Sequence, residues 1–360
     1  MTPGSDAPEG AERAEVLAEI DAEHLPHRVP RNNARTILVR LGFSLAFLAL
    51  LVWRLPGVSP SDLVPEPSPG AFAWVGAAIL VHAGAYILQA LRWAEVSDTL
   101  GIHLPFKRLV SHLLTGEFVS NALPTSFGGD VVRVIRQGND AGDYADAFAA
   151  TSLERLTGWL VLPMLTFAGL AASPALRRLG TEMTVAVVIC VVTLAALGTV
   201  LVLAAHPRAA GRLVGGTGWR RYLAAVHLGV LAFRHQRAQA VKVLAAGVAF
   251  QLVQVVSVWM CARAIGIEQI GFLAVLTFFP PTAIVQNLPL TLGGLGVREA
   301  AFVYFFGALG VSSADAISLG LLVYVVFILS SLAGAPDFLR GGFSGTTANR
   351  PVEDGKRGLG

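Results

Sequence analysis

A short pattern of residues suited to anion binding occurs twice in this chain, each time within a hydrophobic region. Each copy has a proline, a glycine pair and an arginine at the same spacing, and the copies begin at Pro124 and, 165 residues later, at Pro289. Proline and arginine are both costly inside a lipid-spanning helix. The pattern therefore predicts two broken helices at membrane depth, the kind of element that forms substrate sites in membrane transporters.

The chemistry expected of this pattern is electrostatic. A proline ends one helix, the glycines let the backbone turn sharply, and the next half-helix begins with unpaired backbone N–H groups. These groups and the positive end of the helix dipole suit an anion such as a lipid phosphate. Arg133 and Arg298, about one turn further along, offer a bidentate fork to the same anion and are the expected ligands. A simpler alternative is that the glycines only permit close helix packing.

Other charged residues in the same apolar regions extend the candidate site. Glu117, Glu154 and Glu299 could hold the arginines, bind a cationic headgroup or carry a proton, and ion pairs that lock the helices are an equal alternative. Arg155 is interpreted as an anchor that reaches the membrane surface. The expected substrate-binding residues are Glu117, Asn121, Pro124, Gly128, Gly129, Asp130, Arg133, Glu154, Asn287, Pro289, Gly293, Gly294, Gly296, Arg298 and Glu299.

The elements that must position these residues are membrane-spanning helices. Hydrophobic residues make up 54% of the chain, charged residues only 14%, and the mean hydropathy is +0.62, whereas a soluble domain has about 25% charged residues. Windows long enough to cross roughly 30 Å of hydrocarbon are Thr36–Trp53, Ala71–Leu91, Leu156–Ala172, Met183–Ala205, Val243–Ala262 and Ala316–Ala335.

Basic residues in short loops set the expected orientation. Arginine and lysine are concentrated before the first span, in the loop after the second span with Arg92, Lys107 and Arg108, and in residues 206–242. These segments are therefore placed in the cytoplasm, together with both termini. Residues 218–237 alternate arginines with apolar residues, which predicts a helix lying on the membrane surface.

The two halves of the chain follow the same order of span, span, broken hairpin and span. The first hairpin is expected to enter from the cytoplasm, and the second, with a helix at 271–288 interrupted by Pro280 and Pro281, from the other side. We therefore expect an all-α polytopic membrane protein with an inverted repeat. If each hairpin arm crosses fully, the number of spans becomes ten.

The expected domain organisation follows from this repeat. Residues 34–340 form the membrane domain, with repeats at about 36–172 and 183–335, between disordered tails at 1–33 and 341–360. About 35 polar residues precede the first span, so a cleaved signal peptide is not expected.

Several function classes have no support in the sequence. Cys190 and Cys261 lie in or at the end of apolar helices without metal-ligand partners, so neither a disulfide nor a metal site is expected. No hydrolase, protease or nucleotide-binding motif is present, so we expect no enzyme activity and no cofactor. The basic pI of about 9.1 is explained by loops that flank the membrane rather than by nucleic-acid binding.

These motifs resemble the membrane domain of lysylphosphatidylglycerol synthases, a family that includes stand-alone flippase-like members. The resemblance extends over residues 36–340 and is carried by residues 116–133, Leu91-Arg92-Trp93, Glu154-Arg155 and residues 293–299. It implies a multi-pass protein of the cell (inner) membrane that moves or presents a lipid, such as an aminoacylated phosphatidylglycerol, from the inner to the outer leaflet. Residues 341–360 do not supply the soluble aminoacyl-transfer domain of the synthases, so synthase activity is not expected.

The leading hypothesis is a lipid translocator in which Arg133 and Arg298 hold an anionic, aminoacylated or lipid-linked headgroup while one repeat moves against the other. The expected partners are membrane lipids. One alternative is a secondary carrier for a soluble anion that uses the same groove. Another is an accessory subunit whose lipid-modifying enzyme is a separate chain.

Overall fold

The computed structural model describes residues 68–122, 128–205, 219–288 and 294–342, and every regular element in these ranges is a helix. The first predicted span, at 36–53, lies outside the described residues. The helices are α3 (Pro69–Thr99), α4 (Phe106–Ala122), α5 (Gly128–Ala141), α6 (Tyr144–Ala172), η2 (Leu176–Arg178), α7 (Thr181–Ala205), α9 (Trp219–His235), α10 (Arg237–Ala264), α11 (Phe272–Gln286), α12 (Val297–Gly307), α13 (Ser313–Ser331), η4 (Leu332–Gly334) and α14 (Ala335–Gly341).

Five segments of the described chain are long and apolar enough to cross a membrane, and each overlaps one of the remaining predicted spans over most of its length. They are Pro69–Thr99, Tyr144–Ala172, Thr181–Leu203, Arg237–Ala264 and Ser313–Gly341. The sequence-based spans at 71–91 and 156–172 were too short, because α3 and α6 continue for two or three further turns that carry buried charged residues. The all-α membrane architecture is confirmed, and the cytoplasmic placement of the loops and termini stays a prediction.

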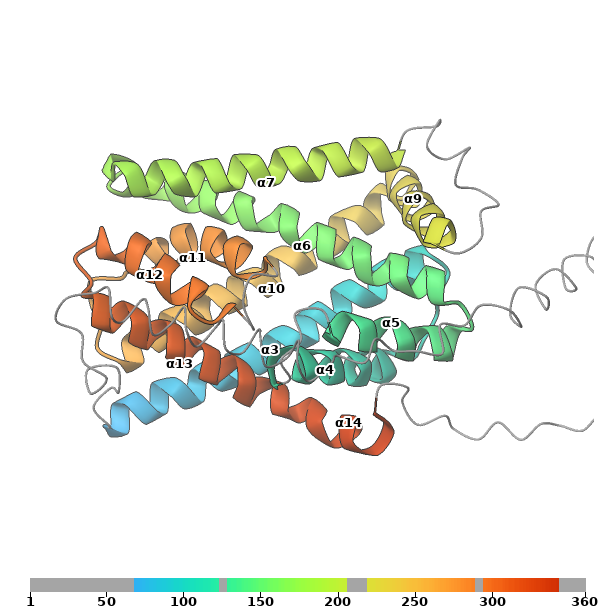
Figure 1. The fold of residues 1–360 in the computed structure, drawn as a ribbon, viewed down its shortest axis with the longest axis horizontal. Helices are drawn as coiled ribbons and strands as arrows, with labels where there is room; N and C mark the ends of the chain where they lie inside the picture. The colour runs from blue at the N-terminus through green and yellow to red at the C-terminus, as the bar shows by residue number, and fades with distance from the viewer. Residues whose placement is uncertain (1–67, 123–127, 206–218, 289–293, 343–360) are drawn as a thin grey trace, which may run out of the picture.

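The helices of the two halves follow one another in the same order. A shift of 165 residues brings α3, α4, α5 and α6 onto α10, α11, α12 and the α13–α14 segment. Figure 1 shows α3 and α10 side by side and running in opposite directions, with the α4–α5 hairpin at one end of the bundle and the α11–α12 hairpin at the other. This is the arrangement that an inverted repeat would produce, although the repeat itself, like the domain limits, stays a prediction.

The hairpin arms are short. Helix α4 has 17 residues and α11 has 15, whereas a helix needs about 20 residues to cross the hydrocarbon core. The two arms of each hairpin pack against each other. These lengths favour hairpins that enter and leave on one side over the ten-span alternative.

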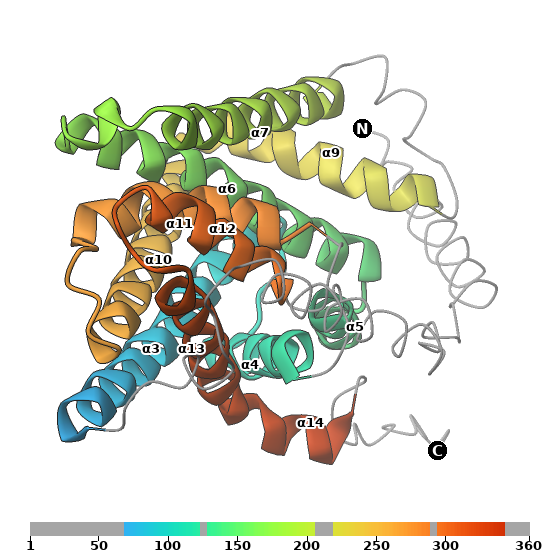
Figure 2. The same cartoon turned by 60° about the vertical axis from the view of Figure 1, so that its left-hand side comes forward.

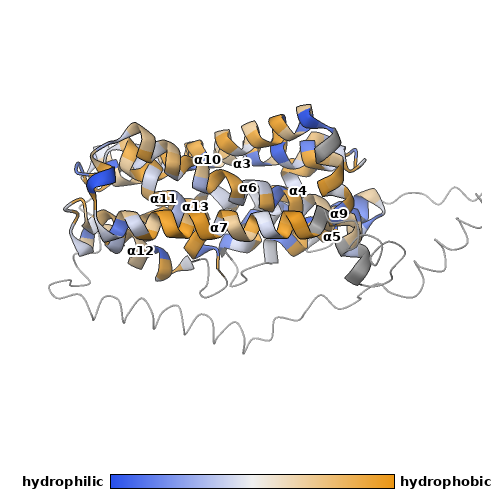
Figure 3. Cartoon of the chain, turned by 90° about the horizontal axis from the view of Figure 1, so that it is seen from above, coloured by the Kyte–Doolittle hydropathy of each residue, from blue (hydrophilic) through white to orange (hydrophobic). Residues whose placement is uncertain are grey.

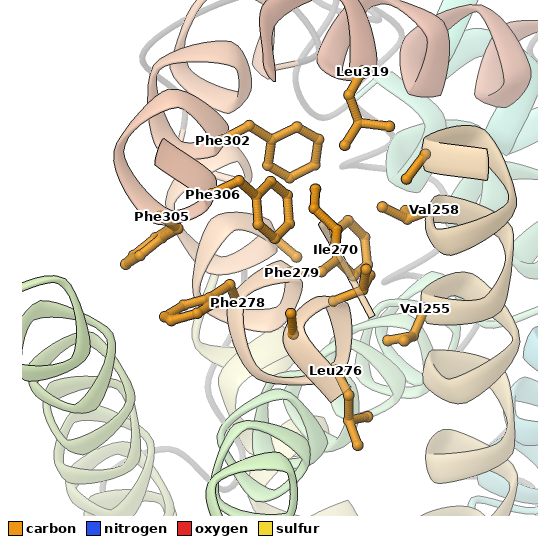
Figure 4. Packing of buried hydrophobic residues seen from close by; sticks show 14 of the residues in the cluster. Val255, Val258, Ile270, Leu276, Phe278, Phe279, Phe302, Phe305, Phe306 and Leu319 are labelled. Carbon is orange, nitrogen blue, oxygen red and sulfur yellow. The ribbon is translucent and has the colours of Figure 1, made fainter. Parts of the chain in front are cut away.

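One expectation about the second hairpin was wrong. Pro280 and Pro281 do not interrupt the helix, because α11 continues through both to Gln286. Each proline removes one backbone donor from the helix, but α11 is inside the protein, with Phe278 and Phe279 at most 1% exposed. Figure 4 shows Phe278 facing Phe305 of α12, and their rings stack at 5.2 Å between centroids. Packing of this aromatic cluster, which includes Phe302 and Phe306, holds the second hairpin in the core.

The outer surface of the bundle is apolar in the way a lipid-facing surface must be. Figure 3 shows hydrophobic residues along the length of α7, where Val192, Val202 and Leu203 are each more than 60% exposed. Helix α9 forms as the alternating pattern at 218–237 predicted. Figure 1 views α9 nearly end-on and Figure 2 from the side, so it lies across the long helices and packs on α6 and α7.

The first hairpin is fixed at its base to the C-terminal end of the bundle. The Arg136 guanidinium of α5 donates to the backbone oxygens of Asp337 at 3.2 Å and Gly342 at 2.7 Å, so it stabilises the end of α14. On the other arm, the backbone of Gly334 lies directly against the carbonyl group of Leu114 of α4, with no room for a Cβ atom. The position of the α4–α5 hairpin therefore depends on a close backbone contact.

We expect Gly334→Ala to destabilise the protein by about 1–3 kcal/mol, because its Cβ would overlap the Leu114 carbonyl and force α4 away. The measurement is thermal unfolding of the purified protein in detergent. Gly198→Ala is the matched control, since Gly198 of α7 is exposed and has open space around it. Equal melting temperatures for the two variants would contradict the importance of this contact.

Candidate functional site

A polar cavity of about 190 Å³ lies between the two halves of the bundle. Its walls come from α3, α4 and α6 of the first half and from α10, α11, α12 and α13 of the second. The polar residues that line it are His82, Tyr86, Gln89, Arg92, Glu117, Ser120, Asn121, Glu154, Arg155, Gln251, Gln254, Gln286, Asn287, Arg298 and Tyr324.

The charge centre of the first half is Glu154 on α6, which is 1% exposed. The Arg92 guanidinium of α3 donates through Nη2 to Oε1 of this carboxylate, and Arg133 of α5 donates through Nη1 to Oε2 at 3.1 Å. The Arg133 guanidinium also lies 4.3 Å from the ring centroid of Trp93, which adds a cation–π contact. Two arginines from different helices thus share one buried carboxylate, and this group joins α3, α5 and α6.

Arg92 is the main functional residue that the sequence analysis placed wrongly. It was assigned to a cytoplasmic loop, but α3 extends to Thr99 and Arg92 is buried at 3% exposure. Gly158 of α6 and Gly247 of α10 make room for it, because a Cβ at either position would lie within 3.4 Å of Arg92 Nη1. Among the described residues, Arg92 Nε and Nη1 have no hydrogen-bond acceptor, and the side chain lines the cavity.

Arg155, which the sequence suggested as a surface anchor, has a side chain that is 38% exposed and forms an ion pair. Its Nη2 donates to Oδ1 of Asp130 in the first turn of α5 at 2.8 Å, and it too lines the cavity. The Asp130 carboxylate also lies 3.6 Å from Arg133. Asp130 therefore links α5 to α6, and it places a carboxylate at the helix N-terminus where the sequence suggested a free anion-binding end.

The second half has an arginine–carboxylate pair of its own. Arg298 Nη2 donates to Oε1 of the adjacent Glu299 at 2.7 Å, and its guanidinium lies 5.2 Å from the ring of Tyr324. The other oxygen of Glu299 accepts from the backbone N–H of Gly296 at 2.5 Å. Gly320 of α13 leaves the space that Glu299 occupies, since a Cβ there would lie 2.8 Å from Glu299 Cγ. The N-terminus of α12 is thus capped by the protein's own carboxylate.

The glycines of the motif have different roles in the two copies. In the first, Gly129 lies in the first turn of α5 and contacts Gly116 and Ser120 of α4 so closely that no Cβ would fit, which is the close-packing alternative. In the second, Gly294 and Gly296 have φ of +74° and +85°, so they provide the sharp turn into α12 that only glycine readily adopts.

The structure brings six of the fifteen expected site residues to the cavity wall: Glu117, Asn121, Glu154, Asn287, Gly294 and Arg298. Five described residues lie behind the wall or at helix starts and do not line it: Gly128, Gly129, Asp130, Gly296 and Glu299. Arg133 also lies behind the wall, where it is paired with Glu154. In this position it does not reach the cavity as the expected direct ligand would. Pro124, Pro289 and Gly293 lie outside the described residues.

Sequence reasoning also missed a row of polar residues on α3. His82, Tyr86, Gln89 and Arg92 recur every three or four positions and all face the cavity, and Gln251 and Gln254 do the same on α10. This spacing is that of one helix face, so a search for polar residues at helical period within apolar spans would have found them. The described residues contain no group of His, Cys, Asp and Glu that could hold a metal ion.

An all-helical bundle with several apolar spans, two short hairpins and a charged cavity between its halves defines a polytopic membrane protein. The sequence matches the family described as lysylphosphatidylglycerol synthase TM region over residues 37–334. The chain therefore belongs to this family, as its motifs indicated. A comparison with curated proteins finds no match.

We expect Glu154→Gln to destabilise the protein by about 3–5 kcal/mol, because Arg92 and Arg133 would lose their shared countercharge inside the bundle. Glu95→Gln is the matched control, since the Glu95 side chain is 32% exposed and its partner Lys242 is 61% exposed. Loss of that exposed pair should cost less than about 1 kcal/mol. Comparable unfolding temperatures for the two variants, measured in detergent, would argue against Glu154 as the charge centre.

Proposed function

We propose that this protein translocates a polar lipid between the leaflets of the membrane, with the headgroup held in the cavity between the two halves. The observation that carries this proposal is the cavity itself, which is lined by Arg92, Arg155 and Arg298 and formed by both halves. Family membership supports a role with lipids. We propose further that the chain is a carrier rather than an enzyme.

The polar groups of the cavity fit a phosphate-containing headgroup. Two guanidinium nitrogens of Arg92, Nε and Nη1, have no acceptor in the described part of the chain, and a guanidinium binds phosphate oxygens with short, strong hydrogen bonds. Gln251 and Gln286 line the same cavity, and each has a side-chain oxygen without a donor among the described residues. These oxygens suit a hydroxyl or ammonium group. The matching ligand class is an anionic or aminoacylated phospholipid, or a lipid-linked headgroup.

We expect the wild-type protein, reconstituted in phosphatidylcholine vesicles, to accelerate transfer of fluorescently labelled phosphatidylglycerol between leaflets, measured by dithionite quenching. Arg298→Gln should slow this transfer by about 10- to 100-fold, because it removes a charge-assisted contact worth about 1.5–3 kcal/mol. Arg108→Gln, at a half-exposed position away from the cavity, should retain the wild-type rate within about twofold.

Two further measurements keep this test interpretable. Gln254→Leu removes a polar group from the cavity wall without changing its charge, so slower transfer in this variant does not depend on unpairing Glu299. Uptake of radiolabelled glycerol phosphate into the same vesicles, with no lipid transfer, would replace the proposal with the soluble-anion carrier. A soluble transferase that co-purifies with the chain, again without lipid transfer, would favour the accessory-subunit alternative.

A further inference from the structure

The ionised residues in and around the cavity form a nearly complete set of pairs. The described chain places four arginines and four carboxylates there: Arg92, Arg133, Arg155, Arg298, Glu117, Asp130, Glu154 and Glu299. Three carboxylates are within ion-pair distance of an arginine. Glu154 binds Arg92 and Arg133, Asp130 binds Arg155, and Glu299 binds Arg298.

Glu117 of α4 is the exception within this set. Within the described part of the chain, its hydrogen bond comes from an uncharged group, the Gln89 amide of α3, which donates to Oε1 at 3.1 Å. It forms no ion pair within 4.0 Å among the described residues. The side chain lines the cavity, so a proton and a bound ligand can both reach it.

The groups that face Glu117 come from every element around it. Tyr86 and Arg92 are on α3, Asp130 and Arg133 on α5, and Arg155 on α6, and all five act on it electrostatically. Tyr324 of α13 contacts the same arm through a hydrogen bond to the Asn121 carbonyl at 3.4 Å. Segment η4 (Leu332–Gly334) has no ionisable side chain. Asp337 of α14 binds Ser111, six residues or about 9 Å before Glu117 on the helix.

The net charge of this set determines whether an anion can bind without a proton. With Glu117 ionised, the four positive and four negative charges cancel. An anionic headgroup would then leave one uncompensated negative charge in a cavity walled by helices, where such a charge is costlier than in bulk water. A proton on Glu117 removes that cost, and Glu117 can take it without breaking an ion pair.

We propose that Glu117 is a proton-binding site coupled to the transported headgroup: one proton from solvent adds to the Glu117 carboxylate when an anionic headgroup enters the cavity, and it leaves when the headgroup leaves. This inference rests on the proposed function, because it assumes that the cavity holds an anionic headgroup. Coupling of this kind is reciprocal, so protonation of Glu117 strengthens anion binding by the same factor by which the anion strengthens protonation.

The sign of the pH dependence follows from this linkage. Affinity for the anion is full at low pH, where Glu117 is protonated even in the empty cavity. It falls by up to about tenfold per pH unit as the pH rises between the protonation midpoints of the empty and the occupied cavity. Above the second midpoint the affinity is low and constant.

The test is calorimetric binding of short-chain phosphatidylglycerol to the purified full-length protein between pH 5 and 8, in two buffers with different heats of ionisation. The pair of buffers gives the number of protons taken up per headgroup. We expect the wild type to take up as much as one proton and to bind more weakly as pH rises. Glu117→Gln, which has nearly the same shape and mimics the protonated acid, should bind with no proton uptake and with affinity independent of pH. Asp140→Asn, outside the cavity, should behave as the wild type.

Each outcome separates this inference from the proposed function. Wild-type binding without proton uptake at any pH, or equal uptake by Glu117→Gln, overturns the role of Glu117 and leaves lipid binding standing. Failure of the folded wild type to bind the lipid at every pH overturns the proposed function and the inference with it. The proton count of the wild type needs no variant, so a folding defect in Glu117→Gln would not prevent the test.

Discussion

The cost of placing charges inside a membrane protein is the constraint on which the rest of this structure depends. An isolated ionised side chain loses several kcal/mol of solvation when it leaves water, and this bundle buries three arginines at 3% exposure or less close to its cavity, Arg92, Arg133 and Arg298. Carboxylates at short distance offset this cost. The most important is Glu154, which accepts hydrogen bonds from two arginines at once. Because those arginines come from α3 and α5 and Glu154 from α6, neutralisation also fixes how the three helices are placed. In this region the helices can pack only in an arrangement that also pairs the buried charges.

Small residues are what make that pairing geometrically possible. A long guanidinium needs space beside neighbouring helices, and Gly158 and Gly247 provide it around Arg92. Gly129 lets α5 approach α4 closely, so that Arg133 extends past Gly116 toward Glu154. The glycines thus act mainly by leaving room, as small residues commonly do between membrane helices. Only in the second copy of the motif is a glycine conformation itself required, at the turn formed by Gly294 and Gly296.

The sequence predicted the helical membrane fold, five of its spans and the short hairpins, because hydrophobic length and helix-breaking residues are local signals. It also singled out Glu117, Asn121, Glu154 and Arg298, whose charge or polarity stands out within apolar segments, and all four line the cavity. Their role as ligands stays a prediction. Prediction from the sequence failed where a residue's position depends on contacts with residues far away in the sequence. Arg92 looked like a surface residue because the apolar run of its span ends at Leu91, and only its contact with Glu154 shows why it is tolerated inside. The pairing of Arg155 with Asp130 was also not visible in the sequence. The continuation of α11 through Pro280 and Pro281 likewise depends on aromatic packing that no local rule contains.

The two copies of the motif differ in a way that bears on which part of the bundle can move. Arg298 and its carboxylate partner are consecutive residues of α12, so a displacement of that helix carries both charges together and leaves the pair intact. On α5, Arg133 is paired with Glu154 of α6, and Asp130 is paired with Arg155 of α6. A displacement of α5 would therefore separate one buried pair and one partly buried pair at once. The first hairpin is in addition fixed to α14 through Arg136. On electrostatic grounds, motion of the second hairpin against a fixed first half costs less than the reverse, because none of the described ion pairs of the cavity has to break.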